Sequence, residues 1–174
     1  KSSFAIADVS DGKRRIDFKN PYFSLFIEGI YDVPSIADGF TNMMHPYLPT
    51  FFPKTDVVVD SSKNDFSFGL DIHNAEQFCQ VLNLPVLLDK PTNLSGFYRP
   101  ASDGFAVRAT VPSMKSGENA LTDAQLNLFL DKEKKMYVLD FTSKYGNLKQ
   151  KYPLNLNLHT EADHDVVLLS LLYD

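Results

Sequence analysis

The sequence is poor in cysteine, in basic clusters and in long apolar runs. Cys79 is the single cysteine among 174 residues, which excludes an internal disulfide and a metal site built from several cysteines. No window approaches the roughly 20 consecutive apolar residues that a membrane-spanning helix needs. The net charge of -5 argues against nucleic acid as a partner, because proteins that bind its backbone usually carry a basic patch.

Motifs of common catalytic and cofactor sites are also missing. The chain has no Gly-x-Ser-x-Gly elbow, no glycine-rich phosphate loop and no His-Glu-x-x-His. The histidines have no spacing typical of a metal site, so we expect surface roles for His45, His73, His159 and His164. Cys79 lies in a short amphipathic segment, where a buried small side chain is expected rather than a nucleophile. The sequence therefore predicts a non-enzymatic protein without catalytic residues, metal or cofactor.

What the chain does contain is apolar alternation, which is clearest at the start of its central segment, 65–112. Phe66, Phe68, Leu70 and Ile72 alternate with small or polar residues. This is the period of a strand with one apolar and one polar face.

The central segment continues with a short helix and a hairpin. Asn74 suits a helix N-cap, apolar residues follow at helical spacing, and Pro85 ends the helix. Asp103-Gly104 stands between two alternating stretches and is a strong hairpin signal. The predicted unit is strand, short helix, strand, tight turn, strand.

Before this unit the sequence predicts strands and a second helix. Residues 22–31 form a strand that is apolar on both faces and therefore needs cover. A helix is expected after Asp32, because Ile36, Phe40 and Met43 fall on one helical stripe. This helix is the natural lid for the preceding strand.

After Pro112 the pattern becomes that of an antiparallel meander. Two leucine-rich alternating stretches, 124–130 and 152–159, read as strands, and Tyr145-Gly146-Asn147 reads as a turn between strands. Residues 166–173 form a last strand that is apolar on both faces.

Together these patterns predict a single, mainly β domain over residues 1–174. Its antiparallel meander would curl into an open trough or a flattened barrel, with one or two short helices capping an end. The chain enters its first strand directly and without a methionine, so we expect it to be an internal segment of a much larger protein.

One face of this sheet would carry large apolar side chains, each worth roughly 1.5 to 3 kcal/mol when buried. Such a face needs an apolar partner, either the opposite wall and the helices of a compact core or a bound acyl chain. The candidate groove residues are Phe66, Phe68, Leu70, Ile72, Leu126, Leu128, Leu130, Leu154, Leu156 and Leu158.

Several stretches carry a resemblance to a known family. They are residues 66–72, Leu84-Pro85, Leu94-Ser95-Gly96 and the Leu-x-Leu meander, together with 27–31 leading to 43–49. Their order resembles the TamB branch (translocation and assembly module) of the AsmA-like proteins, especially versions from Bacteroides-type bacteria.

The resemblance implies a periplasmic section of a large protein anchored in the inner membrane of a Gram-negative envelope. Such proteins fold a long sheet into a trough, the β-taco, whose apolar wall carries phospholipid toward the outer membrane. The implied partners are phospholipid acyl chains, neighbouring segments of the same polypeptide and, through the full-length protein, an Omp85-type barrel in outer-membrane protein assembly.

Two alternatives from other classes remain open. One is a lipocalin-like β-barrel for a small hydrophobic ligand, and the other is a purely structural spacer or adhesion module. A trough predicts an open apolar face and unpaired end strands, a barrel predicts closure and a blind pocket, and a spacer predicts a filled core.

Overall fold

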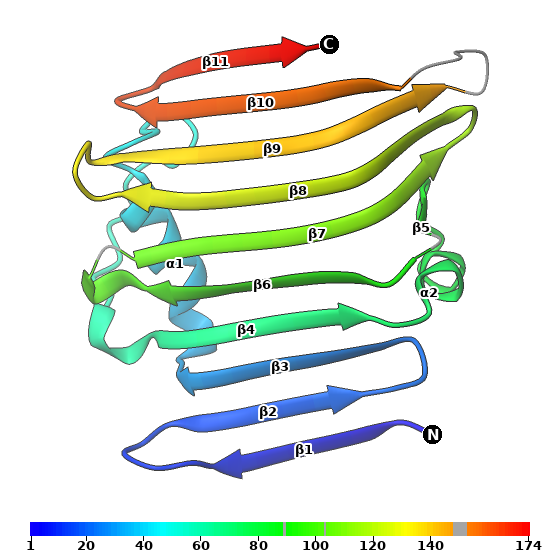
Figure 1. The fold of residues 1–174 in the computed structure, drawn as a ribbon. Coiled ribbons are helices and arrows are strands. Elements are labelled where there is room, and N and C mark those ends of the chain that lie inside the picture. Colours follow the sequence, from blue (N-terminus) through cyan, green and yellow to red (C-terminus); the bar gives the residue numbers. More distant parts are fainter. Residues whose placement is uncertain (89, 103, 148–152) are drawn as a thin grey trace.

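Strands account for most of the chain. The computed structural model describes residues 1–88, 90–102, 104–147 and 153–174 (Figure 1). The strands are β1 (Ser3–Asp8), β2 (Arg14–Lys19), β3 (Phe23–Ile30), β4 (Asp65–Ile72), β5 (Leu87–Leu88), β6 (Thr92–Arg99), β7 (Gly104–Ser116), β8 (Asn119–Asp131), β9 (Met136–Asn147), β10 (Leu154–Asp163) and β11 (Val166–Tyr173).

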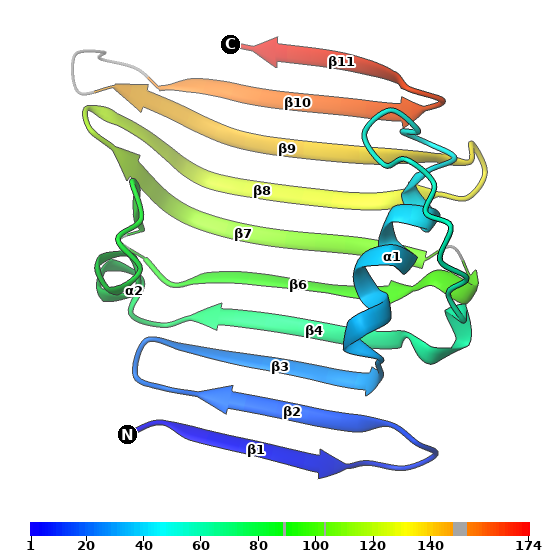
Figure 2. The same ribbon diagram turned by 180° about the vertical axis from the view of Figure 1, so that it is seen from behind.

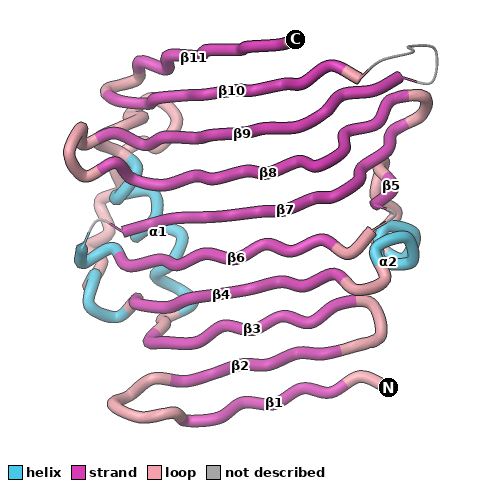
Figure 3. Tube along the Cα trace, in the orientation of Figure 1, coloured by secondary structure: helices cyan, strands magenta, loops and turns pink. Residues whose placement is uncertain are grey.

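These strands form one open antiparallel sheet. Ten of them follow the order β1-β2-β3-β4-β6-β7-β8-β9-β10-β11, and β5 pairs with β7 (Figure 3). The predicted mainly β, antiparallel fold is confirmed in its open form. The flattened barrel is not formed, because β1 and β11 are the two outer edges and no pairing joins them within the described parts of the chain.

The register aligns apolar positions of neighbouring strands into rows across one face, here called the apolar face. In one such row, Leu70 of β4 lies opposite Leu25 of β3 and Leu94 of β6. The row, here called the central row, consists of Phe4, Phe18, Leu25, Leu70, Leu94, Ala109, Leu126, Phe141, Leu158 and Leu171. It crosses all ten strands of the continuous path without a polar residue.

The opposite face, here called the polar face, has a different composition. Because successive side chains of a strand point to opposite faces, the neighbouring positions form a row of their own. This row consists of Ala5, Asp17, Phe26, Gly69, Ser95, Arg108, Asn127, Asp140, His159 and Ser170. The sheet therefore has one apolar and one largely polar surface.

Two helices lie on the apolar face near opposite ends of the strands (Figure 2). The predicted helix after Asp32 is α1 (Val33–Met44), whose buried Met43 and Met44 pack with Phe66 and Tyr98. The second predicted helix is α2 (Ala75–Val81), which packs on the other ends of β3, β4 and β7. No helix in the described ranges is long and apolar enough to cross a membrane.

Two predictions of local turns have different outcomes. The turn predicted at Tyr145-Gly146-Asn147 is wrong, because β9 continues through Asn147, and Tyr145 pairs with Leu121 and Leu154 on its two sides. Asp103 of the predicted hairpin lies outside the described residues, but β6 and β7 on either side of it do pair antiparallel.

Candidate functional site

All ten candidate groove residues lie on the apolar face. Those from β4 alternate with Ser67, Gly69 and Asp71, and those from β8 and β10 occupy the matching positions of their own strands. The register therefore places on one face residues that are up to 92 positions apart in the sequence, from Phe66 to Leu158.

The helices divide these ten residues into three groups. Phe66, Phe68, Leu128 and Leu130 pack in the cluster around α1. Leu70 and Ile72 pack in the cluster around α2. The remaining four are half-buried and belong to neither helix-packed cluster: Leu126, Leu154, Leu156 and Leu158.

The apolar face is exposed at both edge strands, on β1 and on β11, and β11 lies on the side of these four residues. All eight residues of β11 are exposed, and Leu169 and Leu171, on the apolar face, keep 65% and 52% of their accessible surface. Leu171 lies opposite Leu158, which in turn lies opposite Phe141 of β9. We call the uncovered strip the set of Leu126, Phe141, Leu154, Leu156, Leu158, Leu169 and Leu171.

One border of the uncovered strip is the segment that contains α1. This segment leaves the sheet after β3 and returns at β4, and Asn64, which is fully buried, holds its two ends together. The Asn64 Oδ1 accepts a hydrogen bond from the Asp32 N–H at 3.0 Å, and its Nδ2 donates to the Ser35 Oγ at 2.9 Å.

The far end of this segment is fixed to the turn between β10 and β11. The Thr50 hydroxyl donates to the Asp165 carboxylate at 2.8 Å, and the Asp165 N–H donates to the Tyr47 carbonyl at 2.9 Å. The segment thus spans one end of the apolar face from β4 to the last hairpin.

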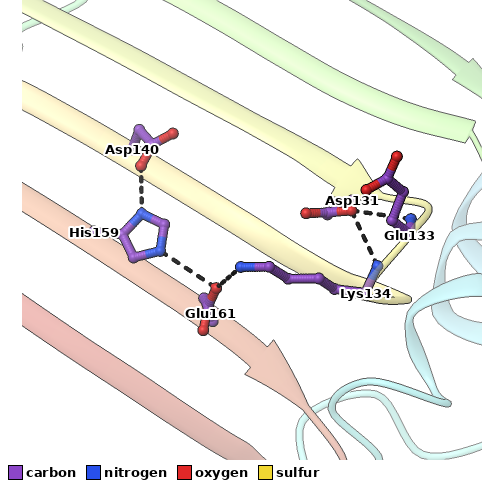
Figure 4. Close-up of polar contacts among 6 residues, drawn as sticks. All are labelled: Asp131, Glu133, Lys134, Asp140, His159 and Glu161. Atoms are coloured by element: carbon purple, nitrogen blue, oxygen red, sulfur yellow. Dashed lines mark hydrogen bonds and ion pairs between the residues drawn. The ribbon is translucent and has the colours of Figure 1, made fainter.

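The polar face carries ion pairs instead of apolar packing (Figure 4). The His159 Nδ1 lies 2.6 Å from Asp140, its Nε2 lies 3.6 Å from Glu161, and Lys134 donates to Glu161 at 2.8 Å. Hydrogen bonding to Asp140 raises the pKa of His159, and hydrogen bonding from Lys134 lowers the pKa of Glu161. These groups stabilise each other's charged forms, and each keeps part of its side chain exposed to solvent.

The other candidate reactive groups have structural partners. His73 contacts the Ser24 hydroxyl at 2.5 Å, and His45 contacts the Phe52 carbonyl at 2.9 Å. Cys79 is buried, as expected, and its sulfur accepts a hydrogen bond from the Leu88 N–H at 3.4 Å. The described residues contain no group of three or more His, Cys, Asp or Glu placed to hold a metal ion.

The sequence prediction missed several members of the apolar face. Leu25, Leu94, Phe141 and Leu171 belong to the central row but were not among the ten candidates. Alternation was the available signal, since each lies in a stretch with period 2 or in a continuous apolar run. What the sequence lacks is the register that aligns them.

Comparison with protein-family models, curated proteins and solved structures finds no significant match, so no relative indicates a function for the apolar face or for the rest of the chain.

Proposed function

We propose that this chain is a non-enzymatic section of a TamB/AsmA-like, periplasm-spanning envelope protein, and that its apolar face holds phospholipid acyl chains in transport toward the outer membrane. The central row is the observation that carries this proposal. This row of apolar side chains runs perpendicular to the strands. It therefore provides a continuous apolar path from one edge strand of the sheet to the other.

The length of the central row suits an acyl chain. With neighbouring strands about 4.8 Å apart, ten strands give a row roughly 43 Å long. One acyl chain spans about half of the ~30 Å hydrocarbon core of a bilayer, or roughly 15 Å. The row is therefore longer than one chain, and a lipid could move along it while keeping apolar contact.

The uncovered strip supports the same proposal on energetic grounds. Its half-buried and exposed leucines leave apolar surface in water, and removing that surface from water is worth about 25 cal/mol per Å². An acyl chain on the strip would supply this burial without the closed pocket that a lipocalin-like barrel uses.

The rest of the proposal concerns the protein as a whole. Neighbouring segments of the same polypeptide would pair with the two edge strands, β1 and β11, whose outer backbone groups are open to another strand. A periplasmic location and assembly with an Omp85-type outer-membrane barrel belong to the same proposal, through the full-length protein.

A structural spacer is the second candidate, and one observation favours it. The clusters around α1 and α2 fill part of the apolar face with the chain's own side chains, as a spacer's core would. The two functions differ in whether lipid occupies the uncovered strip.

Lipid extraction with native mass spectrometry tests the proposal. The purified protein should carry phospholipid, and Leu156→Asp should lose most of it because a carboxylate then lies in the strip. Asn157→Asp is the matched control, since it adds the same charge to the polar face of the same strand. Lipid-free wild-type protein, or equal lipid loss in the control while circular dichroism shows both folded, would leave only the spacer.

A further inference from the structure

A hollow of about 370 Å³ opens on the polar face, where β3, β4, β6 and β7 run side by side. Small residues line it at Ser67, Ser95 and Ala106, and Phe26 on β3 and Phe97 on β6 line it from the two strands that flank β4. Phe68 and Gly96 complete the lining. Its volume falls within the range of small-molecule sites, about 300 to 1,000 Å³. We call this hollow the polar-face slot.

The Phe26 and Phe97 rings are held in place by residues that do not line the slot. Phe26 lies over Gly69, where a Cβ atom would come within 2.4 Å of the ring, so only glycine leaves room for it there. The Arg15 guanidinium lies 5.1 Å from the Phe26 ring centroid, and that of Arg99 lies 4.7 Å from the Phe97 ring centroid. The cation–π contacts help to fix both rings without occupying the slot.

The three arginines around the slot differ in whether they form ion pairs. Arg15 forms ion pairs with Asp17 and Glu28, and Arg99 forms one with Asp65. Arg108 also lines the slot and is exposed, yet it has no ion pair or hydrogen bond within the described parts of the chain. Its guanidinium is therefore free to bind a ligand, and its planar fork matches a carboxylate.

We propose that the polar-face slot binds a small ring compound that carries a carboxylate. The flat face of the ring packs against Phe26 and Phe97, the carboxylate pairs with Arg108, and the hydroxyls of Ser67 and Ser95 serve polar substituents. Aromatic acids and acidic sugars share this chemistry. The slot is on the face opposite the uncovered strip, so this inference stands apart from the lipid proposal.

Titration of the ¹⁵N-labelled 174-residue chain with phenylacetate and, separately, with glucuronate tests the proposal by NMR. At least one of them should give saturable shifts at the Ser67, Ser95 and Phe97 amides, and the compound that binds identifies the ligand class. Arg108→Gln should weaken that binding about tenfold, as expected for a lost charge-assisted hydrogen bond.

Lys19→Gln is the control, because it removes one positive charge from the polar face away from the slot. It should leave the affinity unchanged. Shifts that do not saturate with either compound, or equal weakening by Arg108→Gln and Lys19→Gln, would overturn the proposal. Leu156→Asp should not affect this binding, which separates the result from that of the lipid test.

Discussion

At the scale of single residues, His159 has the most distinctive electrostatic environment. It lies between Asp140 and Glu161 on the polar face, and hydrogen bonding to Asp140 is the main cause that raises its pKa. A raised pKa in the folded state means that folding favours the protonated ring. The stabilisation is complete below the unfolded-state pKa of about 6.5 and is lost as the pH rises through the folded-state value.

We therefore expect the urea midpoint of the wild-type protein to fall across this pH window relative to that of His159→Asn. NMR titration of the His159 ring measures the folded-state pKa directly. A ring pKa at or below that of an unstructured histidine would contradict this account. The lowered pKa of Glu161 acts in the opposite direction and in a more acidic range, so its contribution is lost only as the pH falls.

Single residues also explain how far the candidate site could be predicted. Alternation was enough to place Leu126, Leu154, Leu156 and Leu158 on one face. It could not separate these residues from Phe66, which α1 buries, because burial depends on where a helix from another part of the chain lies.

At the scale of elements, both predicted helices form, but neither begins with a side-chain capping hydrogen bond. Asp32 and Asn74 occupy the N-cap positions, and neither side chain makes a capping hydrogen bond. The Asn74 side chain donates to Gln77 at 2.9 Å instead. Packing on the apolar face must then supply most of the stability of these short helices, as is usual for helices of this length.

Two other elements show the limits of local signals. Gly146 and Asn147 are residue types common in turns, but both pair with β8, and Tyr145 before them pairs with β8 and β10. This strand pairing outweighs the preference of the two residues for a turn. β5 contains only Leu87 and Leu88, too short for any alternation to reveal it. Its strand geometry depends on pairing with β7.

The contact between α1 and β6 gives a prediction at the same scale. Tyr98 is 2% exposed, its hydroxyl has no hydrogen-bond partner in the described structure, and burial raises the pKa of Tyr98 to about 12. A Cβ atom on Gly39 of α1 would lie 2.6 Å from that hydroxyl. Gly39→Ala should therefore destabilise the protein by about 1 to 2 kcal/mol, although the same change usually stabilises a helix by about 0.5 to 1 kcal/mol.

A double-mutant cycle measured by urea unfolding checks this contact. Tyr98→Phe removes the unpaired hydroxyl and should be neutral or stabilising, and Gly39→Ala should then be less destabilising than in the wild type. An equal effect of Gly39→Ala in both backgrounds would show that the hydroxyl does not limit the packing of α1.

At the scale of the whole molecule, the main property of the sheet is that its register aligns one apolar row across all ten strands of the continuous path, although the β8–β9 register shifts between Thr122 and Gln125. The central row is apolar on all ten strands, and the row beside it on the polar face is mostly polar, although β11 also places Val166, Leu168 and Leu172 on the polar face. The antiparallel class and most strand positions could be predicted from periodicity. Whether the sheet is open or closed could not be predicted in this way, because closure depends on whether the two edge strands meet, and no local sequence pattern encodes that.

The measurement that tests the central claim most directly is cross-linking with a phospholipid that carries a photoreactive group on its acyl chain. Mass-spectrometric mapping should place the cross-links on Phe141, Leu158 and Leu171, with Asn157 and His159 of the same hairpin unlabelled. Labels on the polar face, or no specific labels on the folded protein, would contradict the account that the apolar face holds acyl chains.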